Sequence, residues 1–526
     1  MRSLLGRFHR PMSRGAISDM LTMNSLGDGS TLSLDFTTMG GVLDSRLTFS
    51  RAGGGTYVGA DGYIYGVDSA TSASLAIGTG SKSVTLTATA DVDRRFQVGQ
   101  TVYFSSGANN MSGLVTAYNA STQVITINAT ATTGSGSFTS WFVGNASPRF
   151  DYSPTNIGEP RGLLVEGSAV NLALRSSTMG SATYTTQEAT MSTGVSVDPS
   201  NTASAPTMAA IPGFSYSSHL IYSTVGVSNA TSYTLSVFAK ANGYNRIGVC
   251  IAAGARYTAV FNLTGSGSFQ TSSSTVSPAP TGTGYSITAY GNGWYRCSVT
   301  MTTADTTLYP HFMLVNDGAI TFNVNAQATF VGESAKSIYI WGAQLELGSA
   351  NSSHIPTGAS TVTRAVDTAI IAAGTNFSSW YTGGTTGTFV TEWCRCSPTT
   401  TQRTVIATSD VSNQHLHQYI AATTSRLRLA DKVPAFIETT NASVDNSINK
   451  GAFSYSGSVQ SLCLNGGTVV PGTLTFTTAP TWLSIGGPSN NGTSITDTAV
   501  VLNNAIRKIK YFPTRLSDGQ IQGLST

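Results

Sequence analysis

The stretch SIYIWGAQLELG, from Ser337 to Gly348, alternates strictly in its side chains. Successive side chains of a β-strand point to opposite faces, so the stretch predicts a strand with two distinct faces. The apolar face would carry Tyr339, Trp341, Ala343, Leu345 and Leu347. The other face would carry Ile338, Ile340, Gly342, Gln344 and Glu346. The sequence therefore predicts the closing strand of a β-sandwich, with an amide and a carboxylate emerging where the strand leaves the core.

The composition of the whole chain favours the same kind of fold. Of 526 residues, 55 are Gly, 10% are charged and 40% are hydrophobic, whereas ordinary soluble domains carry about 25% charged residues. A surface rich in Ser, Thr, Ala, Gly and Asn is poor for long helices and suits short strands joined by tight turns. We expect an all-β protein, and the length predicts several domains.

The net charge of +3 is too small to indicate a nucleic-acid partner. The exception is the N-terminus, where Arg2, Arg7, Arg10 and Arg14 precede Asp19, the first acidic residue. No apolar run there reaches the length of a signal-peptide core, and no stretch is long enough to cross a bilayer. We therefore expect synthesis in a cytoplasm, without export by a standard signal and without membrane insertion.

Strand and turn patterns divide the chain into units. A change of pattern near Ser81 marks a compact set of alternating segments, and evenly spaced strands follow Arg161, as in a sandwich or jelly roll. Ser517 precedes a short helical pattern as an N-cap. The expected units are a short N-terminal arm (1–30), a β segment linking domains (31–69 and 145–160), an inserted small β module (70–144), a jelly-roll domain (161–363) and a last β domain (372–526).

The cysteines and histidines indicate no metal centre. The odd number of cysteines and the absence of a CxxC pair predict buried, reduced thiols. His415 and His417 would share one strand face, but no third ligand is evident, so we interpret them as surface histidines. We expect no cofactor, although a structural Ca²⁺ held by loop carboxylates and carbonyls stays open. The cysteines are Cys250, Cys297, Cys394, Cys396 and Cys463.

The sequence predicts no enzyme. Glycoside hydrolysis needs two carboxylates about 5 to 10 Å apart, and the 25 Asp and Glu residues are scattered. Glu166, Glu333 and Glu346 lie in the jelly-roll region, and their spacing pairs none of them. No GxSxG, HExxH or phosphate-loop motif is present.

Sugar binding is the chemistry for which the chain offers candidate side chains. Aromatic rings stack on sugar faces, and amides and carboxylates bind hydroxyl groups. The alternative is that these Trp and Tyr residues, which alternate along strands, belong to the core. The candidate ligand-binding residues are Trp294, Tyr295, Tyr339, Gln344 and Glu346.

Several phrases, in a specific order over most of residues 34–526, resemble a recurrent family of phage virion fibre and spike proteins. These proteins carry a jelly roll similar to a carbohydrate-binding module, followed by a concanavalin A/laminin-G-like domain. In the family the ADG segment runs almost directly into PRFDY, whereas here the module at 70–144 lies between them. The phrases are LDFTTMGGVLDSRLTFSRAGGGTYVGADG, PRFDYSP, RGLLVEGSAVNLALRSS, YTLSVFAKA, GNGWYRCSVTMT, IWGAQLELGSANSSHIPTGASTVTRAVD, LNGG and IRKIKYFPTRLSDGQIQGL.

The resemblance implies a structural virion protein on the tail or capsid surface. It implies a homotrimeric tail fibre or tail spike that binds a host-surface receptor, a glycan or a protein, through its β-sandwich domains. The arm would dock to a portal, adaptor, tail or capsid protein, with Arg2, Arg7, Arg10 and Arg14 pairing with acidic groups. The alternatives are a capsid head fibre or decoration protein with a purely structural role, and a polysaccharide depolymerase.

Overall fold

A computed structural model describes residues 28–526, and the four arginines of the predicted docking arm lie outside this range. Within the range, the described residues exclude 39–42, 52–54, 67, 87–97, 99–100, 107–108, 120–121, 146–147, 181–182, 202–204, 214–217, 276, 395–401, 410–413, 423, 431–434, 445–446, 475 and 477.

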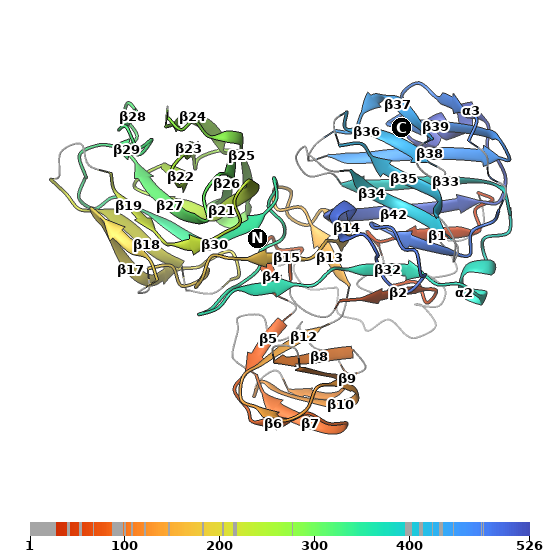
Figure 1. The fold of residues 1–526 in the computed structure, drawn as a ribbon, viewed down its shortest axis with the longest axis horizontal. Coiled ribbons are helices and arrows are strands. Elements are labelled where there is room, and N and C mark those ends of the chain that lie inside the picture. Colours follow the sequence, from red (N-terminus) through yellow and green to blue (C-terminus); the bar gives the residue numbers. More distant parts are fainter. Residues whose placement is uncertain are drawn as a thin grey trace, which may run out of the picture.

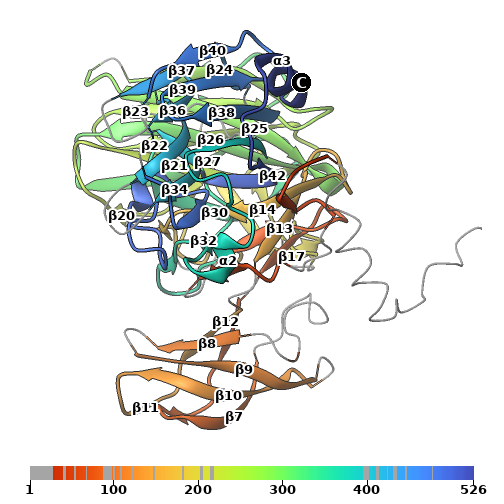
Figure 2. The ribbon, with the colours of Figure 1, turned by 90° about the vertical axis from the view of Figure 1, so that its right-hand side faces the viewer.

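The protein is built almost entirely of β-strands, as the composition predicts. Figure 1 shows a jelly roll on the left, a second sandwich on the right and a small module below the junction between them. The turned view separates the small module from the two larger bodies (Figure 2). Within the described residues, no helix combines the length and apolar character needed to span a bilayer.

The sandwich on the right, called the C-terminal sandwich here, consists of two antiparallel sheets. Phe389, Phe453 and Tyr511 from the first sheet pack with Leu416 and Leu483 from the second in one buried core. The first sheet runs in the order β13 (Arg149–Tyr152), β14 (Pro160–Val165), β42 (Asn504–Phe512), β33 (Thr386–Cys394), β38 (Ile448–Ser456), β39 (Val459–Leu464) and β40 (Val470–Gly472), with β1 (Leu32–Asp35) also on β42. The second runs in the order β2 (Leu47–Ser50), β32 (Thr368–Ile371), β41 (Trp482–Ile485), β34 (Arg403–Ser409), β35 (Gln414–Ile420), β36 (Arg426–Ala430) and β37 (Phe436–Ala442).

The jelly roll also has two sheets, and their facing sides form a separate apolar core. The first sheet runs in the order β17 (Ala189–Ser196), β18 (Ala205–Ala210), β30 (Ser337–Leu347), β21 (Thr231–Asn242), β26 (Trp294–Thr303) and β25 (Thr281–Tyr290). The second runs in the order β16 (Thr185–Gln187), β19 (Leu220–Tyr222), β27 (Thr307–Val315), β22 (Arg246–Ala252), β23 (Arg256–Asn262) and β24 (Ser268–Ser274), with β20 (Val225–Gly226) also on β27. The β28 (Thr321–Phe322) and β29 (Ala328–Thr329) hairpin and the 3-10 turn η1 (Gly291–Gly293) complete this body.

The small module has its own core, in which Phe104, Ile127 and Trp141 are buried. Its main sheet runs in the order β5 (Asp68–Thr71), β12 (Trp141–Asn145), β8 (Thr101–Ser106), β9 (Asn109–Asn119), β10 (Val124–Thr133) and β7 (Gly80–Thr85), beside the pair β6 (Leu75–Ala76) and β11 (Ser137–Phe138). The module enters and leaves through the neighbouring strands β5 and β12, so its two connections to the rest of the protein lie side by side.

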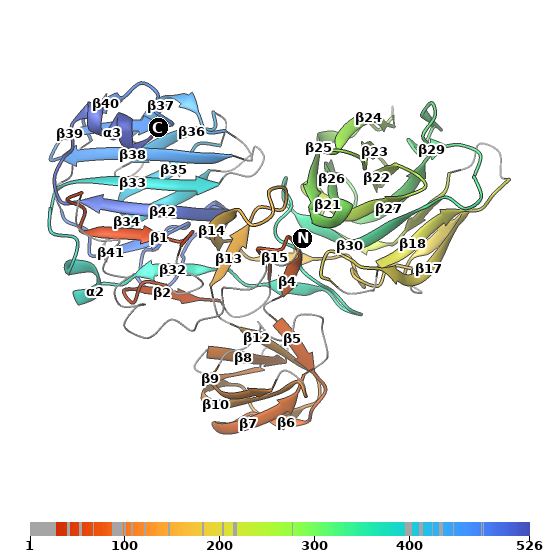
Figure 3. The same ribbon diagram turned by 180° about the vertical axis from the view of Figure 1, so that it is seen from behind.

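The order of strands makes the C-terminal sandwich discontinuous in sequence. The chain begins in this sandwich with β1 and β2, returns to it with β13 and β14, and ends in it with β42. The rear view places β1 and β14 beside β42, with β13 next to β14 (Figure 3). The jelly roll is inserted between β15 (Ala169–Asn171) and β31 (Val362–Arg364), which pair with each other at its base.

This pairing corrects the assignment of residues 31–69 and 145–160 to a segment that only links domains. β1 pairs with residues 508–511 of β42, and β14 (the first strand assigned to the jelly roll) pairs with residues 504–506. Strand periodicity gives each strand its faces but not its partner, and these partners lie more than 300 residues apart. The β3 (Thr56–Val58) and β4 (Ile64–Gly66) hairpin of this segment lies at the junction of the two sandwiches.

Strand β30 is the predicted closing strand, but the prediction of its two faces is wrong. Ile338 and Ile340 point into the jelly-roll core, and so do Ala343 and Leu345. The register with β21 shifts between the Ser236–Gln344 and Phe238–Trp341 pairs, and Gly342 has φ of 68°. Such a bulge adds one residue to the strand and inverts the alternation beyond it.

Several local predictions are confirmed. Helix α3 (Asp518–Leu524) begins after Ser517, whose side chain forms a capping box with Gln520. Cys250, Cys297, Cys394 and Cys463 are buried free thiols, whereas Cys396 lies outside the described residues. The remaining short elements are α2 (Thr375–Ser378) and the 3-10 turn η2 (Thr498–Val500).

The bulge predicts that Gly342→Ala destabilises the jelly roll by about 1–3 kcal/mol. A Cβ at this position would lie 2.8 Å from Cδ2 of Phe238, at a φ that disfavours any side chain. Chemical denaturation of the full chain measures the loss. Gly226→Ala is the matched control, because a Cβ there meets nothing within 4 Å and φ is ordinary. Equal stability of the two variants would contradict the role of the bulge.

Candidate functional site

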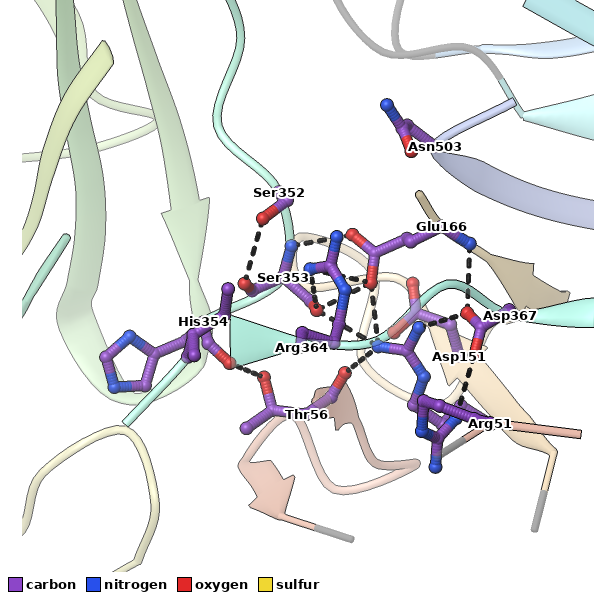
Figure 4. Close-up of polar contacts among 12 residues, drawn as sticks. Arg51, Thr56, Asp151, Glu166, Ser352, Ser353, His354, Arg364, Asp367 and Asn503 are labelled. Atoms are coloured by element: carbon purple, nitrogen blue, oxygen red, sulfur yellow. Dashed lines mark hydrogen bonds and ion pairs between the residues drawn. The ribbon is translucent and has the colours of Figure 1, made fainter. Parts of the chain in front are cut away.

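The two sandwiches meet around a buried cluster of charged side chains, called the junction network here. Figure 4 shows Glu166, Arg364, Asp367 and Ser353 gathered at its centre. Glu166 follows β14, Arg364 ends β31, and Asp367 precedes β32, so the charges converge where the chain passes between the bodies. The network consists of Arg51, Arg149, Glu166, Arg364 and Asp367.

Arg149 is the central donor of the junction network. Its Nη1 donates to Oε2 of Glu166 at 2.7 Å and to the carbonyl oxygen of Thr56 at 2.9 Å. Its Nη2 forms a further ion pair with Asp367, which also accepts from Nη1 of Arg51 at 2.9 Å. Such buried charges are tolerated only when they are paired and hydrogen-bonded.

Glu166 stays ionised despite its burial. Burial alone would raise the pKa of Glu166, but the charges of Arg364 and Arg149 and the hydrogen bonds from Ser353 lower it from 4.5 to about 2. The carboxylate is thus a fixed negative charge at neutral pH, with no proton to give.

Two successive serines fasten the connection from the jelly roll to the C-terminal sandwich. Ser352 donates its amide to Oε1 of Glu346 at 2.8 Å and its hydroxyl to Oε2 at 2.6 Å. Ser353 makes the same two bonds to Glu166, at 2.8 Å and 2.6 Å. One carboxylate comes from each sandwich, so this segment ties the two bodies together.

A cleft of about 300 Å³ lies beside this segment, between the two sandwiches. This volume is at the lower end of the range for small-molecule sites, which favour domain interfaces. One wall comes from β21, β25 and β26 of the jelly roll, another from the β3–β4 hairpin, and a third from β14 and residues 503–504. Residues 349–354 complete the lining. We call it the junction cleft.

The jelly-roll wall of the junction cleft is rich in hydroxyl groups. Ser286 and Ser298 bond through their Oγ atoms at 2.6 Å, and Thr234 and Thr300 through their Oγ1 atoms at 2.8 Å. Thr288 lines the cleft from the edge strand β25. Hydroxyls donate and accept, so this wall can adapt to polyhydroxylated ligands.

The opposite side of the cleft adds charged and amide groups. Arg161 donates to Oδ1 of Asn504 at 2.8 Å and pairs with Asp151 at 3.5 Å. Asp151 also accepts the amide of Val58 at 2.8 Å, which holds the β3–β4 hairpin in place. Burial raises the pKa of Asp151, against the opposing charge of Arg161.

The predicted aromatic binding residues lie mainly in the interior. Trp294 is buried with Phe238 and Trp341, and its Nε1 donates to the carbonyl oxygen of Val197. Tyr295 belongs to the jelly-roll core and donates its hydroxyl to the carbonyl oxygen of Gly265. Tyr339 is half-buried and packs against the Trp294 cluster. The prediction that Trp294 and Tyr295 stack on sugar is therefore wrong, because both rings are buried against other side chains of the jelly roll.

The predicted polar partners Gln344 and Glu346 are buried too, with no more than 2% of either residue exposed. Nε2 of Gln344 donates to Glu346 at 2.7 Å, and its Oε1 accepts the amide of Ile355 at 2.7 Å. The bulge at Gly342 carries both onto the outer face of the jelly roll, where they hold the connecting segment. Neither residue lines the cleft, and these contacts are internal to the protein, so their role is structural.

No group of three His, Cys, Asp or Glu residues that could hold a metal ion occurs in the described part of the chain. His417 is buried rather than on the surface, and its Nε2 bonds Oγ1 of Thr404 at 2.9 Å. Burial lowers the pKa of His417 from 6.5 to about 4, so it is neutral. The side chain of His415 lies outside the described part of the structure.

Sequence reasoning missed the junction network and the jelly-roll wall of the cleft. The signal for the network lay in the phrases FSRAGG, PRFDYSP, LLVEGS and VTRAVD, each of which supplies one or two of its charges. Charged residues inside otherwise apolar strand phrases indicate a buried partner. The hydroxyl wall had no comparable signal, because Ser and Thr are common throughout the chain.

Comparisons with known proteins do not assign the chain to a family. Neither a protein family nor a curated relative matches it. Among solved structures, it is similar to the CBM40 of Ruminococcus gnavus IT-sialidase bound to α2,6-sialyllactose, with 17% identity over 27% of this chain and 84% of that one and a TM-score of 0.23. Domain 4 of the arabinanase AbnA from Geobacillus stearothermophilus, in complex with arabinotriose, gives 13% identity over 34% and 82% with a TM-score of 0.24.

Mouse laminin α1 chain domains LG4-5 give 10% identity over 58% of this chain and 90% of that one, with a TM-score of 0.19. All of these identities and TM-scores are low, so the likeness assigns no function to the chain.

The junction network predicts that Glu166→Gln destabilises the folded chain by about 3–5 kcal/mol at pH 7, because it leaves buried arginines short of a carboxylate. Because the pKa of Glu166 is lowered to about 2, its contribution is present above pH 4.5 and is lost as pH falls toward 2. The difference in free energy of unfolding between wild type and variant should become smaller as the pH falls from 4.5 to about 2. Denaturant titrations at several pH values measure it.

The matched control is Glu333→Gln, which breaks an exposed pair with Lys336 whose N–O distance is 2.8 Å. An exposed pair contributes about 0–1 kcal/mol, so this control should unfold nearly like the wild type. A Glu166→Gln variant as stable as the control would show that the network does not hold the junction.

Proposed function

We propose that this chain is a phage virion fibre or spike that binds a host-surface glycan in the junction cleft. The observation that carries the proposal is the cleft itself, which is enclosed by both sandwiches and lined by hydroxyl, amide and charged groups. The order of the phrases shared with phage fibre and spike proteins supports the virion role. The fold supports it too, since it is a multi-domain β protein with two sandwiches.

The lining chemistry favours a sugar over an apolar ligand. Ser286, Ser298 and Thr300 supply hydroxyls, Asn504 supplies an amide and Arg161 supplies donors. Sugars present many hydroxyl groups, each of which needs a donor or acceptor when it leaves water. A cleft of about 300 Å³ would take a short part of a glycan, with the rest of the chain in solvent.

The contacts of Glu166 do not suit this residue for a role as the acid of a glycoside hydrolase. Asp151 and Glu166 are the carboxylates on the lining. Glu166 bonds two arginines and Ser353, and its pKa of about 2 leaves it no proton to donate. A glycosidase needs a general acid that is protonated at working pH, and Glu166 does not meet this need.

The remaining parts of the proposal concern assembly. The arm at 1–30 would attach the chain to a portal, adaptor, tail or capsid protein through Arg2, Arg7, Arg10 and Arg14. The particle would carry the chain as a homotrimer whose contacts come from β-domain faces. A head fibre with a purely structural role is the alternative, and host adsorption separates the two.

The proposed binding site predicts that Thr288→Trp weakens glycan binding by about tenfold or more, or about 1.4 kcal/mol. The indole would fill the junction cleft from the edge strand β25, where the sheet can accept a larger side chain. Binding is measured on arrays of host-surface polysaccharides and as inhibition of phage adsorption by the purified chain.

Ser274→Trp is the matched control, since Ser274 is exposed on the other edge strand, β24, and does not line the cleft. It should bind as the wild type does. Loss of binding in both variants, or in neither, would contradict the location of the site, and absence of all glycan binding by the wild type would contradict the proposed function.

The assembly role predicts that removal of residues 1–27 abolishes incorporation into particles while the β domains stay folded. The truncation keeps Asp28, which pairs with Lys510 at 2.7 Å beside β1. Particle content is measured by immunoblotting of purified virions, and folding by thermal denaturation of the truncated chain. Normal incorporation of the truncated chain would refute the docking role of the arm.

A further inference from the structure

Among the described residues, the junction cleft contains a buried arginine that forms no ion pair with a carboxylate. Arg296 of β26 lines the cleft and is 4% exposed. Its Nη1 donates to the carbonyl oxygen of Ser352 at 2.6 Å and its Nη2 to Oγ of Ser236 at 3.0 Å. Over the part of the chain that the structure describes, no carboxylate oxygen lies within 4 Å of this guanidinium.

The other buried arginines at the junction behave differently. Arg51, Arg149 and Arg364 each form an ion pair with Glu166 or Asp367. A buried guanidinium normally has such a partner, because neutral acceptors alone offset only part of the cost of its desolvation. Arg296 is therefore the one of these four arginines placed to accept an anion from outside the chain.

The acidic groups on the cleft do not oppose an incoming anion strongly. Asp151 pairs with Arg161, and Glu166 pairs with Arg149 and Arg364. Glu346 does not line the cleft, and it is engaged by the amide and hydroxyl of Ser352 and by Gln344. Each negative charge near Arg296 is thus already bound by donors of the protein.

A second side chain on the cleft has unused hydrogen-bonding atoms. Within the described residues, neither ring nitrogen of His354 has a hydrogen-bond partner, whereas an unpartnered Nε is a feature that Arg296 shares with Arg149 and Arg364. His354 is 2% exposed and lines the cleft, and Figure 4 shows its ring turned away from the junction network toward the strands of the jelly roll. Buried polar atoms without partners are rare in native proteins and point to a bound group.

Burial, followed by the nearby charge of Arg296, lowers the pKa of His354 from 6.5 to about 3. The imidazole is therefore neutral at physiological pH, with one N–H donor and one acceptor nitrogen. A neutral donor beside a guanidinium suits a ligand group that carries charge and also accepts hydrogen bonds.

We propose that the junction cleft selects glycans that carry a carboxylate, with the acid group on Arg296 and hydroxyls of the same sugar on Ser286, Ser298 and Thr300. This selectivity rests on the proposed glycan-binding function and adds the class of sugar. Guanidinium groups bind carboxylates through charge-assisted hydrogen bonds with fixed geometry. Uronic acids and sialic acids share this chemistry.

The test compares methyl glucuronide with methyl glucoside, a pair that differs only by the C6 carboxylate, on the full-length protein by ligand-detected NMR titration. Methyl N-acetylneuraminate glycoside forms a second acidic arm that separates the two sources of carboxylate. We expect about tenfold tighter binding of at least one acidic sugar than of the neutral one. This comparison needs no variant, so it does not depend on how a substitution folds.

Variants then assign the preference to Arg296. Arg296→Met should lower the ratio of acidic-sugar to neutral-sugar affinity to about one, and Arg296→Lys should retain part of the preference, because the charge stays and the two-pronged guanidinium geometry is lost. Arg246→Met is the matched control, since Arg246 bonds the carbonyl oxygens of Asn316 and Gly318 and does not line the cleft.

Equal binding of acidic and neutral sugars, blocked by Thr288→Trp, would overturn the acid selectivity and leave the proposed function standing. An acid preference that survives Arg296→Met would overturn the role of Arg296. Failure of the wild type to bind any of these sugars or any arrayed polysaccharide would overturn both the selectivity and the proposed function.

Discussion

The pairing of Arg149 with Glu166 and Asp367 is the interaction on which the arrangement of the two sandwiches depends. These charged side chains are buried away from water. Each one is therefore stable in its charged form only while its oppositely charged partners are present. Arg149 also holds the β3–β4 hairpin through Thr56, and Glu166 holds the connecting segment through Ser353. The β3–β4 hairpin, the connecting segment and the strands that carry Arg149 and Glu166 thus meet at one polar centre. Their contacts fix the walls of the cleft beside it.

The clamp made by Ser352 and Ser353 shows how a short connection can be made rigid without hydrophobic packing. Each serine satisfies one carboxylate with an amide and a hydroxyl, and the carboxylates belong to different bodies. The backbone of Ser352 in turn accepts from Arg296. The segment that connects the sandwiches therefore also lines the cleft, so the position of this segment sets the shape of the cleft.

The sequence predicted the elements better than their partners. Alternation identified β30, and the cap at Ser517 identified α3, because both signals are local. The faces of β30 were misassigned before Gly342, since alternation alone does not reveal a bulge whose φ only a glycine adopts readily. The placement of β1 and β14 on β42, and of Arg149 against Asp367, depends on contacts between distant segments. The sequence around Arg296 does not distinguish it from other strand residues, because its burial and its neighbours depend on contacts between distant segments.

The discontinuous C-terminal sandwich has a consequence for biosynthesis. Leu32 pairs with Tyr511, so β1, the first strand of the described residues, has no partner until β42 has been made. The small module and the jelly roll have their own cores and can fold while the chain is still growing, whereas β1 and β14 lack their shared partner until β42 has been made. Pairing of this kind is slow and exposes unpaired strands to wrong partners. A chain terminated before residue 504 would therefore carry two finished domains together with β1 and β14 lacking the strand that pairs with both.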